Sequence, residues 1–174
     1  MATSVKGAIN LRKALRQFTP DLAKETTKEI GNFLKPVVKN ARGFVPANNQ
    51  IPSGWLVGNQ KGKWQRAAFD SSIAKRGIGY KTTPSKTNAY GFKALVSILN
   101  KTAGGSIYEI AGIKSGVTGR FTPRLGGELS GKGSKMTGRA MYRAWAEDEG
   151  KTKGAVLKAI FTSADKFNKT AKVR

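Results

Sequence analysis

The stretch Thr19–Gly43, TPDLAKETTKEIGNFLKPVVKNARG, predicts one long amphipathic helix. Thr19 suits the N-cap position, and Pro20 suits the first turn, where its missing N–H costs nothing. Its apolar residues recur at spacings of three and four, with Thr26 filling a gap, and are Leu22, Ile30, Phe33, Leu34, Val37, Val38 and Ala41. Gly43 and the later Pro46 stop the helix. Pro36 removes a backbone donor, so we expect a kink near residues 32–36.

Shorter elements are predicted on both sides of this helix. Residues 4–18 predict a helix that buries Val5, Ile9, Leu15 and Phe18 and exposes Arg12, Lys13 and Arg16. Residues 77–83 and 92–100 predict strands joined by a turn, and Phe92 lies on the covered face of the second. Residues 106–113 fit either a short helix or another strand. Residues 139–149 and 152–169 predict closing helices.

These elements indicate an α+β fold in a single domain over residues 1–174. The long N-terminal helix and the C-terminal helices pack on a small, mainly antiparallel sheet. Two stretches interrupt this core: a tryptophan-containing loop or arm at 44–76 and a flexible, basic, glycine-rich loop at 114–138. A connection as long as the second indicates either a functional segment or disorder.

The charge of the chain is its strongest global signal. Lys and Arg number 32 against 10 Asp and Glu, which gives a formal net charge of +22. A chain of this kind should associate with polyanions such as nucleic acid or acidic protein surfaces. The alternative is a merely solubilising surface, although self-repulsion on this scale favours a partner. No run approaches the length of a membrane span, so no membrane partner is expected.

The residue types present argue against catalysis. The chain has no Cys and no His, which removes thiol chemistry, the commonest general base and the commonest metal ligand. The stretch GGELSGKG, residues 126–133, nearly matches a phosphate-binding loop, but Gly133 replaces the required Ser or Thr and no buried strand precedes it. No carboxylates are spaced as a metal-dependent nuclease requires. We therefore expect no enzyme activity and no cofactor.

Basic residues and aromatic residues remain as candidates for direct contacts. The candidate contacts to DNA or to an acidic partner are Lys114, Arg120, Arg124, Lys132, Lys135, Arg139 and Arg143. Glycine-rich basic loops can follow a phosphate backbone without reading its sequence. The candidate subunit-interface anchors are Trp55, Trp64 and Phe69, which could equally fix their loop onto the core. Base stacking by Trp64 among Lys61, Lys63 and Arg66 is a further alternative.

The order of several short motifs resembles a known family. The long helix ends in ARGFVP (41–46), SGWL (53–56) and strands follow, and SIYEIAG (106–112) and GRAMYRAW (138–145) flank the basic loop. This order resembles the head–tail joining, or tail-completion, proteins of long-tailed bacteriophages, particularly those that infect actinobacteria. The resemblance covers nearly the whole chain and lies in the order of the motifs. The tryptophan-containing loop and the long basic loop depart from the family pattern.

The resemblance implies a structural virion protein of the phage neck, made in the host cytoplasm. Family members form rings, commonly hexameric, which join the head connector to the tail tube or tail terminator around the DNA channel. A homo-oligomeric ring that touches genomic DNA without sequence preference is therefore expected. The rival expectation from the charge alone is a free, non-specific DNA-binding protein.

Overall fold

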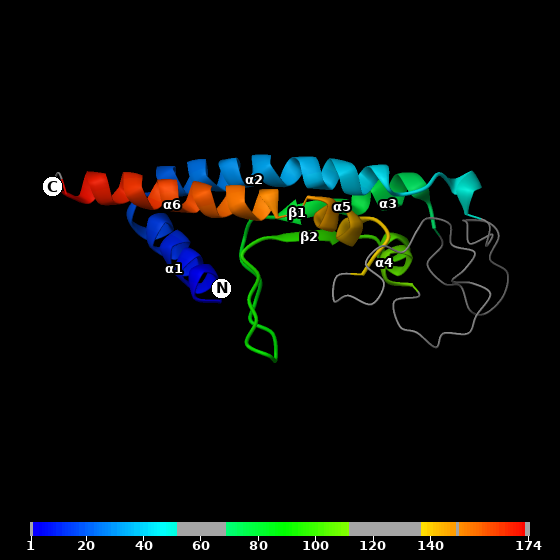
Figure 1. Ribbon diagram of the computed structural model, residues 1–174, viewed down its shortest axis with the longest axis horizontal. Coiled ribbons are helices and arrows are strands. Elements are labelled where there is room, and N and C mark those ends of the chain that lie inside the picture. The colour runs from blue at the N-terminus through cyan, green and yellow to red at the C-terminus, as the bar shows by residue number, and fades with distance from the viewer. Residues whose placement is uncertain (1, 52–68, 112–136, 149, 173–174) are drawn as a thin grey trace. The chain divides into compact units, whose positions relative to one another are not determined.

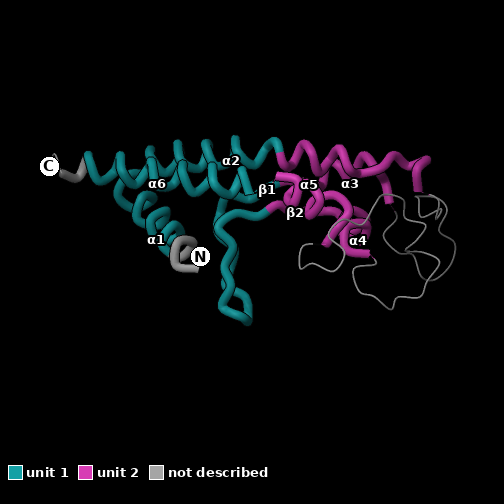
Figure 2. The backbone as a smooth tube through the Cα atoms, in the orientation of Figure 1, with its two compact units in different colours: residues 1–36, 80–97, 150–174 teal, residues 37–79, 98–149 magenta. Residues whose placement is uncertain are grey.

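The computed structural model describes residues 2–51, 69–111, 137–148 and 150–172. Its contacts divide the chain into two compact units (Figure 2): unit 1 holds residues 1–36, 80–97 and 150–174, and unit 2 holds residues 37–79 and 98–149. Helix α2, Pro20–Gly43, runs without interruption through Pro36, and the division between the units falls directly after that residue. The predicted long helix is confirmed, whereas the single domain stays a prediction.

Unit 1 is built from helices α1 (Ala2–Phe18) and α6 (Lys151–Lys172) and the first part of α2. Helix α1 packs against α6, and α6 lies beside α2 (Figure 1). The hydroxyls of Thr26 and Ser163 share a buried hydrogen bond of 2.6 Å, and the Thr152 hydroxyl donates to the Phe33 carbonyl at 3.3 Å. The buried apolar side chains of this unit include Ala8, Leu15, Ala23, Ile30, Leu34, Val156, Ala159 and Ile160.

Helix α1 buries a different face from the one that the sequence indicated. Arg12 was expected on the exposed face, but only 5% of it is exposed, whereas the expected core residue Phe18 is 66% exposed. The buried positions are Ala8, Arg12 and Leu15, which follow at spacings of four and three and therefore share one stripe. The prediction placed Arg12 by its residue type rather than by its position on the helix.

A hairpin arm, residues 82–96, connects the strands β1 (Ile78–Lys81) and β2 (Ser97–Asn100) of a two-stranded antiparallel sheet. The Ser85 N–H donates to the Ala94 carbonyl at 2.9 Å, and Gly91 turns the chain with φ +74°. The predicted turn is confirmed, but the second strand begins only at Ser97. Phe92 therefore lies on the arm and is 63% exposed, which corrects its expected place on a covered face.

Unit 2 contains the end of α2, a 3₁₀ turn at Asn48–Gln50, and helices α3 (Ser71–Gly77), α4 (Ala103–Ile110) and α5 (Met141–Glu147). Helix α3 packs against α4. The Asp70 carboxylate caps α3 by accepting a hydrogen bond from the Ile73 N–H at 2.8 Å. It also accepts a hydrogen bond from the Ser72 hydroxyl, and the two bonds lower the pKa of Asp70. The buried apolar side chains of unit 2 include Val37, Val38, Ala41, Val45, Ile51, Phe69, Ala74, Ile78, Tyr108, Ala140 and Ala144.

The α+β class is confirmed, because the described residues form six α-helices and one small antiparallel sheet. Residues 103–110 are helical, which decides between the two alternatives left open for that stretch. Within the described ranges, no helix combines the length and the apolar character needed to cross a membrane.

Candidate functional site

A buried carboxylate organises the part of unit 2 where two of the sequence motifs meet. Glu109 of α4 is only 2% exposed. Its side chain accepts three backbone hydrogen bonds: from the Ala140 N–H at 2.8 Å, the Met141 N–H at 3.1 Å and the Tyr142 N–H at 2.9 Å. These N–H groups open helix α5, whose N-cap residue Ala140 has no side chain able to accept them. Glu109 therefore caps α5 from a different helix.

Arg139, which directly precedes the N-cap residue of α5, donates hydrogen bonds back to the end of α4. Its Nη1 donates to the carbonyl of Ala111 and, at 3.4 Å, to the carbonyl of Tyr108. Its Cζ also lies 5.7 Å from the centroid of the Tyr108 ring, within cation–π range. Only 5% of Arg139 is exposed, and burial lowers the pKa of its guanidinium while the neighbouring Tyr108 and Glu109 raise it.

We call these five residues, Tyr108, Glu109, Ala111, Arg139 and Ala140, the clamp. The chain leaves the described residues at Ala111 and re-enters them at Thr137, so the clamp joins the two flanks of the basic segment. Gly138 fits because its neighbours are too close for a side chain: a Cβ there would lie 2.7 Å from Tyr142 Cδ2 and would overlap Glu109 Oε1. The clamp therefore joins described residues that precede and follow the basic segment in the sequence.

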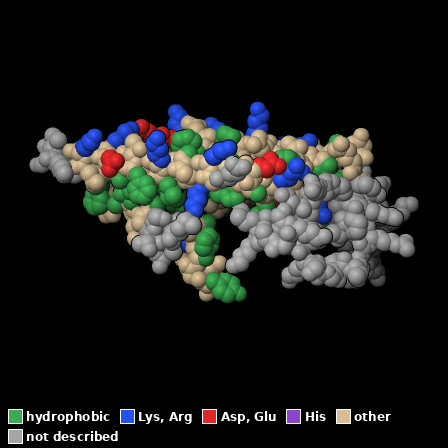
Figure 3. All heavy atoms as spheres, in the orientation of Figure 1, with side chains coloured by type: hydrophobic (Ala, Val, Ile, Leu, Met, Phe, Trp, Pro, Cys, Tyr) green, Lys and Arg blue, Asp and Glu red, His purple; other side chains and the backbone are tan. Residues whose placement is uncertain are grey.

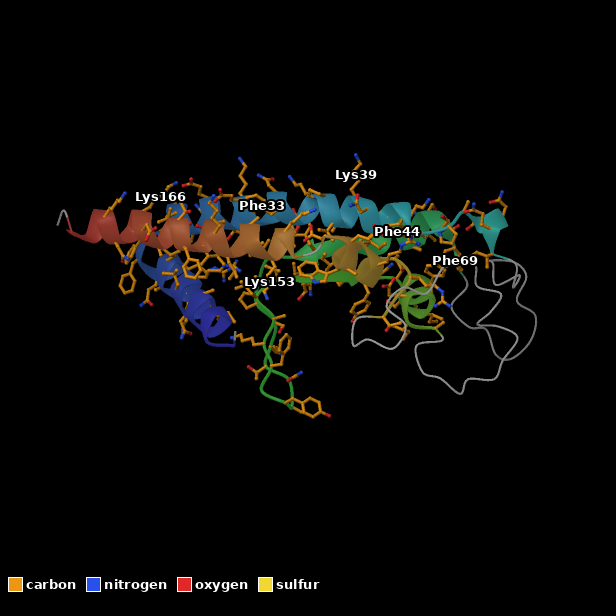
Figure 4. The ribbon with its side chains drawn as sticks, viewed as in Figure 1. Phe33, Lys39, Phe44, Phe69, Lys153 and Lys166 are labelled. Carbon is orange, nitrogen blue, oxygen red and sulfur yellow. The ribbon has the colours of Figure 1, made fainter. Side chains whose placement is uncertain are left out.

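Aromatic packing supports the clamp from the core side. The rings of Phe69 and Tyr108 lie 5.4 Å apart between centroids, tilted by 45°. Burial raises the pKa of the Tyr108 phenol to about 12. Phe69 is fully buried, so it anchors its segment to the core of unit 2 (Figure 4), and its alternative role as a subunit-interface anchor is wrong. Trp55 and Trp64 lie outside the described residues.

The predicted basic contacts divide into three groups. Lys114, Arg120, Arg124, Lys132 and Lys135 lie outside the described residues. Arg139 is buried in the clamp, so its expected contact with DNA or an acidic partner is corrected to a structural role. Arg143 remains partly exposed, with its Cζ 4.2 Å from the centroid of the Phe44 ring and its Nε 3.0 Å from Glu147 Oε1.

The sequence did not single out Glu109 as a structural residue. The sequence feature that could have indicated a buried Glu109 is its position between Tyr108 and Ile110, in a motif with no other charged residue. A carboxylate at such a position is buried only when donors satisfy it, which the three N–H groups do here. The donors follow some thirty residues later in the chain, so neither motif alone reveals the pairing.

Basic side chains outnumber acidic ones on one face of the described residues (Figure 3). The face in Figure 3 shows many Lys and Arg side chains along the helices and few acidic ones. The acidic and other metal-ligating side chains of the described residues nowhere gather in a group of three or more. The groups that this surface offers are suited to holding anions by charge and hydrogen bonding.

Comparison of the chain with protein-family models, with curated proteins and with solved structures found no match. The family resemblance therefore rests on the motifs and their order.

Proposed function

We propose that this chain is a structural subunit of the neck of a long-tailed bacteriophage. Copies of it would form a ring, commonly of six, that joins the head connector to the tail tube or tail terminator around the DNA channel. The observation that carries the proposal is the clamp, because its residues come from the two motifs SIYEIAG and GRAMYRAW on which the resemblance rests. The two motifs thus act as one structural unit with the basic segment between them.

The charge of the chain fits a subunit that works without catalysis beside DNA and acidic proteins. Duplex DNA carries one charge per ~1.7 Å, so a channel about 40 Å tall would enclose roughly 24 phosphates. A ring of six copies, each at +22, would carry far more positive charge than this. The surplus would meet acidic surfaces of neighbouring neck and tail proteins, and the contacts with DNA would be diffuse and non-specific.

The direct test is reconstitution of particles in a phage whose genome encodes this chain. Without the chain, we expect DNA-filled heads and completed tails that remain separate in electron micrographs. Adding the purified full chain should join them, and the joined particles should show a ring at the neck. Normal particles in the absence of the chain would contradict the proposal and would favour the free DNA-binding protein.

Salt dependence of duplex DNA binding tests the role of the basic segment. A variant with the segment residues Lys114, Arg120, Arg124, Lys132 and Lys135 all replaced by Gln loses five charges. A matched control makes the same replacement at the exposed helix residues Lys24, Lys28, Lys35, Lys39 and Lys158. We expect the segment variant to lose most of the salt slope, at about 0.9 per lost phosphate contact, and the control to lose little. Equal losses would show that no particular segment contacts DNA.

A further inference from the structure

A basic groove lies in unit 1 between helix α1 and the hairpin arm. Its volume is about 690 Å³, within the range of ligand sites in proteins. Five basic side chains line it: Arg12, Lys13 and Arg16 from α1, and Lys86 and Lys93 from the arm. Its other lining residues are Ile9, Gln17, Thr83, Pro84 and Ser85, so no carboxylate of the described residues lines the groove beside these cations.

Arg12 is the buried residue of this groove. It is only 5% exposed, and its Nη2 has no hydrogen-bond partner among the described residues. Its Nη1 donates to the Leu95 carbonyl at 3.5 Å. Burial and the neighbouring charge of Arg16 both lower the pKa of Arg12, so its surroundings oppose its positive charge. A buried cation of this kind is unfavourable until an anion pairs with it.

The arm holds its two lysines in place through a defined turn. The Ser85 N–H bonds to the Ala94 carbonyl at 2.9 Å, and the Asn88 N–H bonds to the Phe92 carbonyl at 2.9 Å. Lys86 follows Ser85 in the chain, and Lys93 precedes Ala94. Because Ser85 and Ala94 are paired, Lys86 and Lys93 lie across from each other on the arm. The groove thus has one buried guanidinium and a rim of four cations on two different elements.

We propose that this groove binds an acidic segment of a partner protein, with one carboxylate of that segment paired to Arg12. A planar guanidinium suits a carboxylate because two N–H groups can donate to its two oxygens. Lys13, Arg16, Lys86 and Lys93 would then meet the flanking acidic residues. This proposal rests on unit 1 alone and does not depend on the neck function.

Two observations favour a peptide over nucleic acid. The phosphates of a duplex lie on a wide, rigid cylinder, which can touch the rim lysines but cannot reach a guanidinium that is 95% buried. The same arm also exposes large apolar side chains, with Tyr90 94% and Phe92 63% exposed. Aromatic residues beside Arg are typical of protein interfaces, and a peptide can supply apolar contacts together with its carboxylates.

Binding of a labelled deca-glutamate peptide to the full chain, measured by fluorescence anisotropy, tests the proposal. A decathymidylate oligonucleotide of similar charge is the comparison probe. The groove variant Lys86→Gln/Lys93→Gln should weaken peptide binding at least tenfold. The control Lys158→Gln/Lys169→Gln, which changes two exposed lysines of α6 by the same charge, should weaken it less than threefold.

Arg12→Met provides a second readout that separates binding from folding. We expect this variant to lose peptide binding while its melting temperature stays at or above that of the unaltered chain. Equal losses in groove and control variants, or no peptide binding at all, would overturn the proposal. A lower melting temperature for Arg12→Met would make Arg12 a structural residue. Groove-dependent binding that is tighter for the oligonucleotide would overturn the choice of a peptide.

Discussion

Arg12 of unit 1 and Arg139 of unit 2 are buried to the same extent but have opposite surroundings. Each is 5% exposed, and each has one guanidinium nitrogen that finds no hydrogen-bond partner within the part of the chain that the structure describes. Arg139 donates to two carbonyls, lies over the Tyr108 ring and is attracted by Glu109. Arg12 makes one long hydrogen bond to a described residue, the Leu95 carbonyl at 3.5 Å, and is repelled by Arg16.

We infer from this difference that Arg139 stabilises the fold and that Arg12 serves the proposed binding of an acidic segment. A buried charge with partners from its own chain fixes the arrangement of those partners, as Arg139 and Glu109 do for the clamp. A buried charge without partners from its own chain lowers the stability of the fold. Such a residue can be kept in a protein because binding requires it. The predictions below test each side of this comparison.

The largest effect is expected from removing the carboxylate of the clamp. Glu109→Ala leaves three N–H groups at the start of α5, one buried and two part-buried, without their acceptor and removes the attraction on Arg139. The free energy of unfolding should therefore fall by about 3–5 kcal/mol. Urea unfolding followed by circular dichroism measures this change. Glu109→Gln keeps one acceptor oxygen and should lose roughly half as much. A loss below ~1 kcal/mol for Glu109→Ala would mean that the clamp does not stabilise unit 2.

The next effect comes from crowding the clamp without changing its charges. Gly138→Ala places a Cβ against Glu109 Oε1 and 2.7 Å from Tyr142 Cδ2, so we expect a loss of about 2 kcal/mol. Gly154→Ala in α6 is the control, because nothing lies within 4 Å of its Cβ position. That control should gain about 0.5–1 kcal/mol from helix propensity. Equal changes in the free energy of unfolding for both variants would show that Glu109 and Tyr142 can move away from a Cβ at position 138 without loss of stability.

Tyr108 gives the clamp a dependence on alkaline pH. Its pKa is raised to about 12 in the folded chain by burial, against about 10 in the unfolded chain, so the folded state holds its proton more tightly. The stabilising contribution is complete below pH 10 and is lost as the pH rises toward 12, by on the order of 2 kcal/mol. Unfolding free energies between pH 9 and 12 measure it. Tyr108→Phe should lose this part of the pH dependence, and an unchanged slope in that variant would assign the effect to other groups.

The smallest effect is expected from a buried pair of hydroxyls in unit 1 that, unlike Arg12, bond to each other. The Thr26 and Ser163 hydroxyls share a buried bond of 2.6 Å, so a double-mutant cycle of Thr26→Val and Ser163→Ala should give a coupling of about 1 kcal/mol. This result would show that the buried Thr26 and Ser163 hydroxyls stabilise each other within unit 1, in contrast to Arg12. A coupling near zero would show that the bond adds nothing to the stability of unit 1.

The helices could be predicted because their signals are local. The stretch from Pro20 to Gly43 carries its own apolar stripe, and the helix begins and ends at the residues where the sequence predicted it. The Thr19 hydroxyl, predicted as the N-cap, instead donates to the Leu15 carbonyl of α1 at 3.4 Å. The second strand was predicted too long because apolar residues recur at every second position from Phe92, at Ala94, Val96 and Ile98, as in a strand. Residues 85–94 instead pair with each other within the arm, which the alternation alone does not distinguish.

The clamp and the groove could not be predicted because each joins residues far apart in the chain. Glu109 meets its donors 31 to 33 positions later, and Arg12 meets Leu95 83 positions later. Residue type also misled, because an arginine and a glutamate are usually exposed. Spacing was the better guide to Arg12, which follows Ala8 by four positions and precedes Leu15 by three.

The most direct test of the comparison is the unfolding free energy of two matched variants, Arg12→Met and Arg139→Met, each without added ligand. Methionine keeps a similar apolar volume and removes the charge. We expect Arg139→Met to lose about 3 kcal/mol, since it leaves the Tyr108 and Ala111 carbonyls without this donor and removes the positive charge beside Glu109. We expect Arg12→Met to gain about 1 kcal/mol. Losses of similar size in both variants would contradict the account, because Arg12 would then hold the fold as Arg139 does.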